Sequence, residues 1–96
     1  MRAEEYMKET GPLRVRGVHS LPENRLNIHP NEGADLGLMT TRYSVDLDGT
    51  GPSEIFLLNE CPPETIEINS KKWEKLGKPS KAKLAYEEGK LYIRKV

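Results

Sequence analysis

A forty-residue echo in the order of strand, turn and glycine signals is the feature that most constrains the fold of this chain. Three sets of matched positions share the interval: 26–28 (LNI) with 66–68 (IEI), 36–37 with 76–77 (both Leu-Gly), and Gly49 with Gly89. Each half then closes on an apolar segment, EIFLL in the first and KLYIR in the second. The strand parity before the turn glycine slips by one residue, which indicates a small insertion and deletion there.

Two such units in 96 residues predict a pseudo-symmetric pair, because neither unit is large enough to bury its own apolar face. The repeat would span residues 25–58 and 65–96. Leu and Gly are common residues, so chance recurrence is the alternative interpretation.

Short alternating segments predict a mainly β domain over residues 13–96. Residues 13–21 alternate Leu13 and Val15 with Arg14 and Arg16, which is typical of a half-exposed strand. Further strands are expected at 25–28, 41–48, 54–59, 65–68, 81–88 and 90–96, with 54–59 buried on both faces. Residues 29–37 are expected to form a loop or a single helical turn. Residues 1–12 are expected to form a tail or a short helix.

The helix signals are strongest at residues 71–76. Asn69 or Ser70 supplies an N-cap, and Gly77 followed by Pro79 ends the helix. Trp73 and Leu76 share one face at a spacing of three residues, so Trp73 is expected to pack on the core rather than to stack on a ligand.

The segment YSVDLDGT at 43–50 resembles the catalytic opening of a haloacid-dehalogenase-type phosphatase, in which Asp46 and Asp48 would act as nucleophile and acid. That chemistry needs a parallel sheet built from strand–helix–strand crossovers, and the 48 residues after Asp48 read as hairpins. An oxygen-rich calcium loop would need a Gly and a bidentate Glu at other positions. The sequence therefore predicts a turn at Asp48-Gly49, with positive φ at Gly49 and Gly51, and no enzyme.

Composition indicates a small soluble, cytoplasmic protein. No apolar run approaches the roughly 18 residues of a spanning helix, so no membrane partner is expected. The spacings of His19, His29 and the lone Cys61 match no metal template, and Cys61 is expected to be a buried or half-buried thiol. We expect no cofactor, no metal and no small-molecule substrate.

Charge is divided unevenly along the chain. Residues 1–65 carry six basic and eleven acidic side chains, whereas residues 66–96 carry nine basic and four acidic ones. Such asymmetry points to a basic surface that meets phosphate or an acidic partner, or to two halves that neutralise each other in the fold. The candidate nucleic-acid-binding residues are Lys71, Lys72, Lys75, Lys78, Lys81 and Lys83, with the first four as the preferred phosphate contacts.

The C-terminal segment TIEINSKKWEKLGKPSKAKLAYEEGKLYIRKV resembles the SpoVT/AbrB-like (MazE-type) swapped-hairpin domain. That family runs strand, short helix, Leu-Gly, strand, acidic-Gly turn and strand, which here would be 65–68, 71–76, 76–77, 82–86, 88–89 and 90–94. The resemblance implies a small β-barrel, DNA binding, transcription regulation and a dimer formed by exchanged hairpins. The arginine that contacts DNA in the family has no counterpart in Cys-Pro-Pro-Glu at 61–64.

Together these patterns predict a mainly β, barrel-like fold with one or two short helices and a non-enzymatic nucleic-acid-binding regulator of AbrB/MazE-like type. A homodimer or a protein partner is expected. The alternative function is a small protein-interaction adaptor, or an accessory or inhibitory protein of a phage or mobile element, that works through its acidic first half.

Overall fold

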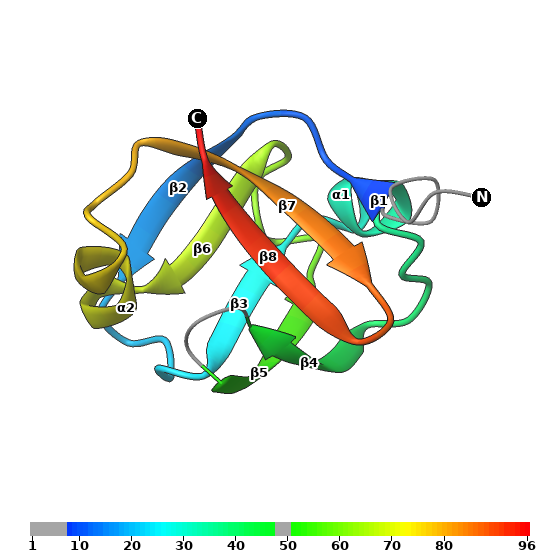
Figure 1. Ribbon diagram of the computed structural model, residues 1–96, viewed down its shortest axis with the longest axis horizontal. Helices are drawn as coiled ribbons and strands as arrows, with labels where there is room; N and C mark the ends of the chain where they lie inside the picture. Colours follow the sequence, from blue (N-terminus) through cyan, green and yellow to red (C-terminus); the bar gives the residue numbers. More distant parts are fainter. Residues whose placement is uncertain (1–7, 48–50) are drawn as a thin grey trace.

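The structure is a computed structural model that describes residues 8–47 and 51–96 (Figure 1). Their elements in chain order are β1 (Lys8–Glu9), β2 (Leu13–Val18), β3 (Arg25–Ile28), α1 (Pro30–Asp35), β4 (Arg42–Leu47), β5 (Gly51–Leu57), β6 (Thr65–Asn69), α2 (Ser70–Lys75), β7 (Lys81–Glu87) and β8 (Lys90–Lys95).

Seven of these strands close into one mixed β-barrel. Their order is β7-β2-β6-β3-β5-β4-β8, and β8 pairs back with β7 to complete the ring, while β1 adds to β7. The pairs β2–β6, β3–β5 and β4–β8 are parallel and the others antiparallel. This arrangement confirms the expected mainly β, barrel-like fold, and the barrel closes with strands from a single chain.

Strand alternation places the core inside the barrel. Leu26 and Ile28 of β3 face Ile68 and Ile66 of β6 across their antiparallel pair, and all four side chains are at most 1% exposed. The expectation that residues 54–59 are buried on both faces is wrong: in β5 the residues alternate, with Ile55 buried and Phe56 half-exposed. A strand in a barrel of this size has one face toward the core and one toward solvent, so alternation is the natural pattern.

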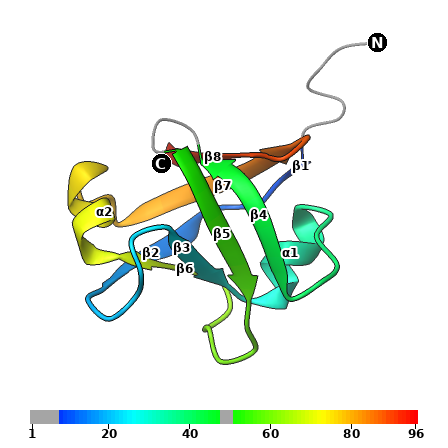
Figure 2. The ribbon, with the colours of Figure 1, turned by 90° about the horizontal axis from the view of Figure 1, so that it is seen from below.

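The two helices lie at opposite ends of the molecule along its longest axis (Figures 1 and 2). Asn69 is the N-cap of α2, as expected, and accepts hydrogen bonds from the backbone N–H groups of Lys71 and Lys72. The loop or helical turn expected at 29–37 is the helix α1, capped by His29. In the N-terminal segment, Lys8–Glu9 form strand β1, and residues 1–7 lie outside the described residues.

The turn residues follow the predicted chemistry where the structure describes them. Gly51 and Gly77 have positive φ values of 85° and 88°. Glu88 and Gly89 both have positive φ, as a two-residue hairpin turn requires. Asp48, Gly49 and Thr50, the centre of the phosphatase-like segment, lie outside the described residues.

The strand pairings recur at the forty-residue interval seen in the sequence. Arg14 pairs with Thr65 in β2–β6, and Glu54 pairs with Arg25 in β5–β3, so each pair maps onto the other when forty is added or subtracted. At the centre of β3–β6, Asn27 opposes Glu67, its own counterpart. These pairings relate residues 13–47 to residues 53–87, a different division from 25–58 and 65–96, and leave β8 as the closing strand.

Candidate nucleic-acid interface

The structure separates the six lysines proposed from sequence into two groups. Lys71, Lys72 and Lys75 lie on α2 at one end of the barrel, and Lys78 lies in the turn that follows. Lys72 is half-buried, and this burial lowers the pKa of its ammonium group, an effect that nearby Lys75 reinforces and Glu23 opposes. The α2 group therefore includes one lysine that the fold partly withdraws from solvent.

Lys81 and Lys83 belong instead to the outer face of the sheet. In β7 they alternate with Ala82 and Leu84, which point into the core and have no exposed surface. Residues paired across neighbouring strands share a face of the sheet. Lys81 is paired with Arg14 of β2 and is therefore on the same side of the barrel wall.

Strand register extends this surface across three strands. Lys83 is paired with Arg94 of β8, and Arg16 follows Arg14 on the outer face of β2. We name the basic sheet face by these five outward side chains: Arg14, Arg16, Lys81, Lys83 and Arg94. It contains two like-charged cross-strand pairs, Arg14/Lys81 and Lys83/Arg94, side by side along β7.

Like charges placed directly opposite one another on adjacent strands destabilise a sheet. Within residues 8–47 and 51–96, no ion pair or side-chain hydrogen bond engages Arg14, Lys81 or Lys83. These three side chains therefore hold a positive charge that the described part of the fold does not neutralise.

Carboxylates balance the two remaining cations of the face. Arg16 Nη1 lies 3.6 Å from Glu67 Oε2, and Arg94 Nη1 donates to Glu9 Oε1 at 3.0 Å. Glu67 also accepts a hydrogen bond from Asn27 Nδ2 at 3.2 Å, which satisfies that buried amide. Arg16 and Arg94 thus border the unpaired group and are partly committed to the fold.

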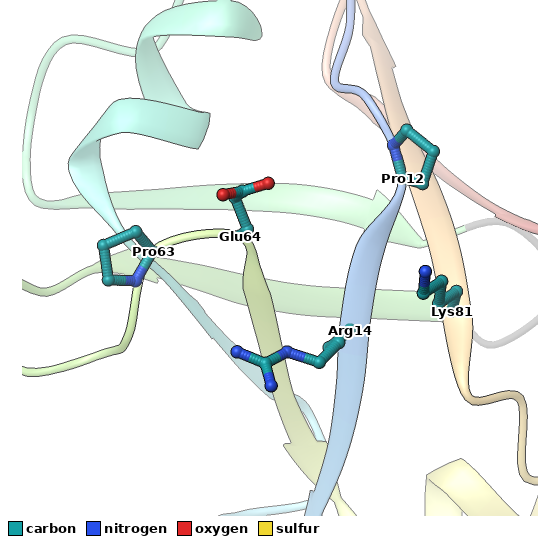
Figure 3. Close-up of a pocket in the computed structure, with 5 residues that line it drawn as sticks. All are labelled: Pro12, Arg14, Pro63, Glu64 and Lys81. Atoms are coloured by element: carbon teal, nitrogen blue, oxygen red, sulfur yellow. The ribbon is translucent and has the colours of Figure 1, made fainter.

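Two open hollows flank Arg14. The first, about 280 Å³, is lined by Pro12, Arg14, Pro63, Glu64 and Lys81. Figure 3 shows Arg14 extending from β2 over β6, with Lys81 on the other side of β2 and Glu64 at the start of β6. The second, about 380 Å³, is lined by Arg14, Val15, Arg16, Pro62 and Thr65. The prolines give both hollows rigid walls, and the cations supply donors for an anion.

The equivalent surface of the other half is not basic. Forty residues from Arg14 and Arg16 stand Glu54 and Phe56, and forty residues before Lys81 stands Thr41. Arg25 lies 3.8 Å from the centre of the Phe56 ring, and Arg42 pairs with Glu54 at 3.2 Å. On this surface Arg25 contacts the Phe56 ring and Arg42 contacts the Glu54 carboxylate, so among the described residues these two cations are not left unpaired as Arg14 and Lys81 are.

A third hollow, next to α1, is apolar. It measures about 230 Å³ and is lined by Pro30, Ala34, Leu38, Met39, Thr40, Thr41 and Leu57. Met39 at its rim is 84% exposed. The Tyr43 hydroxyl fixes this rim by accepting hydrogen bonds from the backbone N–H groups of Met39 and Thr40. Hydrogen bonding with the Thr40 side chain, followed by these two backbone hydrogen bonds, lowers the Tyr43 pKa.

Cys61 is buried, as expected, and its thiol donates to the Thr65 carbonyl at 3.7 Å. Burial raises its pKa to about 12, and the nearby carboxylates of Glu67 and Glu32 add to the effect. Among the described residues, no three His, Cys, Asp or Glu side chains gather as a metal site would require. The part of the chain that the structure describes contains no helix long and apolar enough to cross a membrane.

Sequence reasoning had not proposed Arg14, Arg16 or Arg94 as site residues. Their alternation with apolar neighbours already marked Arg14 and Arg16 as outward-facing. What the sequence did not show is the pairing of β2 with β7, which brings Arg14 to Lys81, 67 positions later in the chain.

Comparison of the chain with protein-family models, with curated proteins and with solved structures gave no match.

Proposed function

We propose that this protein is a non-enzymatic nucleic-acid-binding regulator and that the basic sheet face contacts the sugar-phosphate backbone. The observation that carries the proposal is the adjacent like-charged pairs, Arg14/Lys81 and Lys83/Arg94, of which Arg14, Lys81 and Lys83 have no neutralising partner among the described residues. Phosphate contacts by arginine and lysine supply most of the sequence-independent affinity for nucleic acid.

The resemblance to the SpoVT/AbrB-like domain supports the same class of function. It implies transcription regulation in the cytoplasm and a dimer, and both belong to the proposal. Because the barrel core is complete within one chain, such a dimer would form by contact between closed barrels rather than by exchange of the β7–β8 hairpin.

The test is a fluorescence-anisotropy titration of labelled DNA at 50 and 200 mM salt. Three phosphate contacts give a log–log salt slope of about −2 to −3, which lowers affinity roughly 16- to 64-fold over this range. The double variant Arg14→Glu/Lys81→Glu should abolish binding at both salt concentrations. Absence of binding by the unmodified protein at 50 mM salt would contradict the proposal.

The double variant Lys71→Glu/Lys75→Glu is the matched control, since it makes the same change of charge on exposed residues of α2. If the sheet face is the interface, the α2 variant loses much less affinity than the sheet variant. The opposite ranking would assign the interface to α2, and equal losses would show that overall charge alone drives binding.

The apolar hollow beside α1 favours a second candidate, the protein-interaction adaptor. Exposed methionines suit surfaces that adapt to a partner, because the thioether side chain is flexible and polarisable. An adaptor would lose its partner on Met39→Asp and keep it on Arg14→Glu/Lys81→Glu. Affinity capture with both variants separates the adaptor from the nucleic-acid binder.

A further inference from the structure

The aromatic side chains of the described residues differ in the contacts that their rings already make within the fold. Trp73 packs on the core and donates from Nε1 to the Pro79 carbonyl at 2.9 Å. Tyr43 packs on the core and accepts two backbone hydrogen bonds, and Tyr86 also packs on the core. Phe56 is covered by Arg25 at 3.8 Å from its ring centre. Each of these four rings has a structural task.

Tyr92, the remaining aromatic residue of the described part of the chain, differs from these four. It lies in β8 between Leu91 and Ile93, both of which pack toward the core, so its own side chain is on the outer face. Its cross-strand partner is Ala85, whose methyl group leaves room for a ring lying on the sheet. Within residues 8–47 and 51–96, no hydrogen bond or cation–ring contact engages Tyr92, which is half-exposed.

Tyr92 adjoins the basic sheet face. It is two residues from Arg94 on β8, and Lys83 of β7 is its diagonal neighbour, at a Cα separation of roughly 7–8 Å. Of the carboxylates near it, Glu9 accepts from Arg94, and Glu87 stands opposite Lys90 in the strand register. The unpaired charge of Lys83 and Lys81 is thus next to an unoccupied aromatic ring on the same surface.

We propose that the nucleic acid bound here is single-stranded, with a base stacked on Tyr92 and its neighbouring phosphates held by Lys83, Lys81 and Arg14. This inference rests on the proposed function and names its ligand class. A stacking ring is useful only where bases are unpaired, and aromatic rings set among cations on a sheet are how sequence-tolerant single-strand binders work. Duplex readout needs an element that enters a groove, whereas the helices here have six residues each and lie at the barrel ends.

The experiment compares an oligonucleotide of about 12 nucleotides, a length within the site sizes of single-strand binders, with its own duplex at 50 mM salt. Tighter binding of the single strand is expected. Tyr92→Ala should weaken single-strand binding by about 5- to 160-fold, the effect of losing one stacked base, and leave any duplex affinity unchanged. Tyr92→Phe should retain single-strand binding, because the ring is kept.

Phe56→Ala is the matched control, an outward aromatic of the other half whose face Arg25 already covers, and it should leave affinity unchanged. Far-UV circular dichroism confirms that each variant is folded. Equal affinity for both forms together with no effect of Tyr92→Ala would overturn the single-strand inference while the proposed function stands. No binding of either form by the unmodified protein would instead defeat the proposed function.

Discussion

At each end of the barrel a helix packs against a strand, and the two ends differ in which element supplies the large residue of the contact. At the α2 end, strand residue Gly17 leaves space and helix residue Trp73 fills it: a Cβ on Gly17 would lie 2.9 Å from Trp73 Cε3. At the α1 end, forty residues away in each case, strand residue Leu57 is large and helix residue Gly33 is small. A Cβ on Gly33 would lie 2.8 Å from Leu57 Cγ and closer still to Leu57 Cδ2.

The exchange of large and small residues shows that each helix–strand contact is fitted as a unit. Interiors are packed to crystal-like density, so a large residue on one element requires a small one opposite. The two ends of the barrel also differ in the surface that they present. Trp73 reaches the loop after its own helix and closes that end, whereas Leu57 is too short to do so and the apolar hollow remains beside α1.

The largest expected effect is the loss of Trp73. Trp73→Ala removes a ring that packs over Gly17 and the hydrogen bond to Pro79, and we expect it to lower the free energy of unfolding by about 3 kcal/mol. Leu57→Ala at the other end should cost about 2 kcal/mol, because fewer atoms are removed. Urea denaturation measures both. A Trp73→Ala variant as stable as the parent would show that the α2 end does not depend on this contact.

Adding one methyl group to Gly33 tests the exchange directly. Gly33→Ala should destabilise the protein by about 1–3 kcal/mol, since the new Cβ overlaps Leu57 and forces it to move. In a Leu57→Ala background the same substitution should stabilise by up to about 1 kcal/mol, because alanine favours helix over glycine. A double-mutant cycle gives the coupling.

Gly11→Ala serves as the control for this cycle. A Cβ there meets nothing within 4 Å, and its backbone is not in the left-handed region, so stability should be unchanged. If Gly33→Ala costs the same with and without the Leu57 side chain, the two residues are not fitted to each other.

The sequence predicted most elements of both halves because each carries its own local signals. Alternation marked the strands, and Asn69 with Gly77 marked the ends of α2. The α1 helix was harder to predict: its N-cap is a histidine and Gly33 interrupts it, so its stability depends on Leu57, a tertiary contact. The contact between Gly17 and Trp73 could not be predicted either, because no local sequence signal connects a strand glycine with a tryptophan 56 residues later.

The candidate interface was predictable only in part, for a related reason. Lys81 and Lys83 were proposed from the sequence because positive charge gathers in its C-terminal third. Arg14 was not proposed from the sequence, because charge along a chain does not show which strands pair. The parallel pairing of β2 with β6 and the short pairing with β7, which place Arg14 next to Lys81, are set by the closure of the barrel.

The two helix caps should differ in strength. Asn69 accepts from two backbone N–H groups of α2, and its Nδ2 donates to the Leu21 carbonyl at 2.6 Å. His29, its counterpart, accepts one hydrogen bond, from Asn31 at 3.0 Å. We expect Asn69→Ala to cost about 1 kcal/mol more than His29→Ala, because it also leaves a buried carbonyl without its donor. Thermal or urea unfolding of both variants checks the difference, and equal losses would contradict it.

The smallest effect concerns Lys72, whose counterpart in α1 is the buried Glu32. Burial lowers the Lys72 pKa below its ordinary value of 10.5, so the folded state binds this proton less readily than the unfolded state does. The resulting cost to stability is fully present below the folded pKa and disappears as pH rises past 10.5. Lys72→Met should therefore raise stability by a few tenths of a kcal/mol at pH 7, with the gain shrinking toward pH 11. Thermal unfolding at both pH values, with exposed Lys71→Met as the control, measures it. Destabilisation by Lys72→Met at pH 7 would instead show that attraction to Glu23 outweighs burial and that Lys72 strengthens the α2 end.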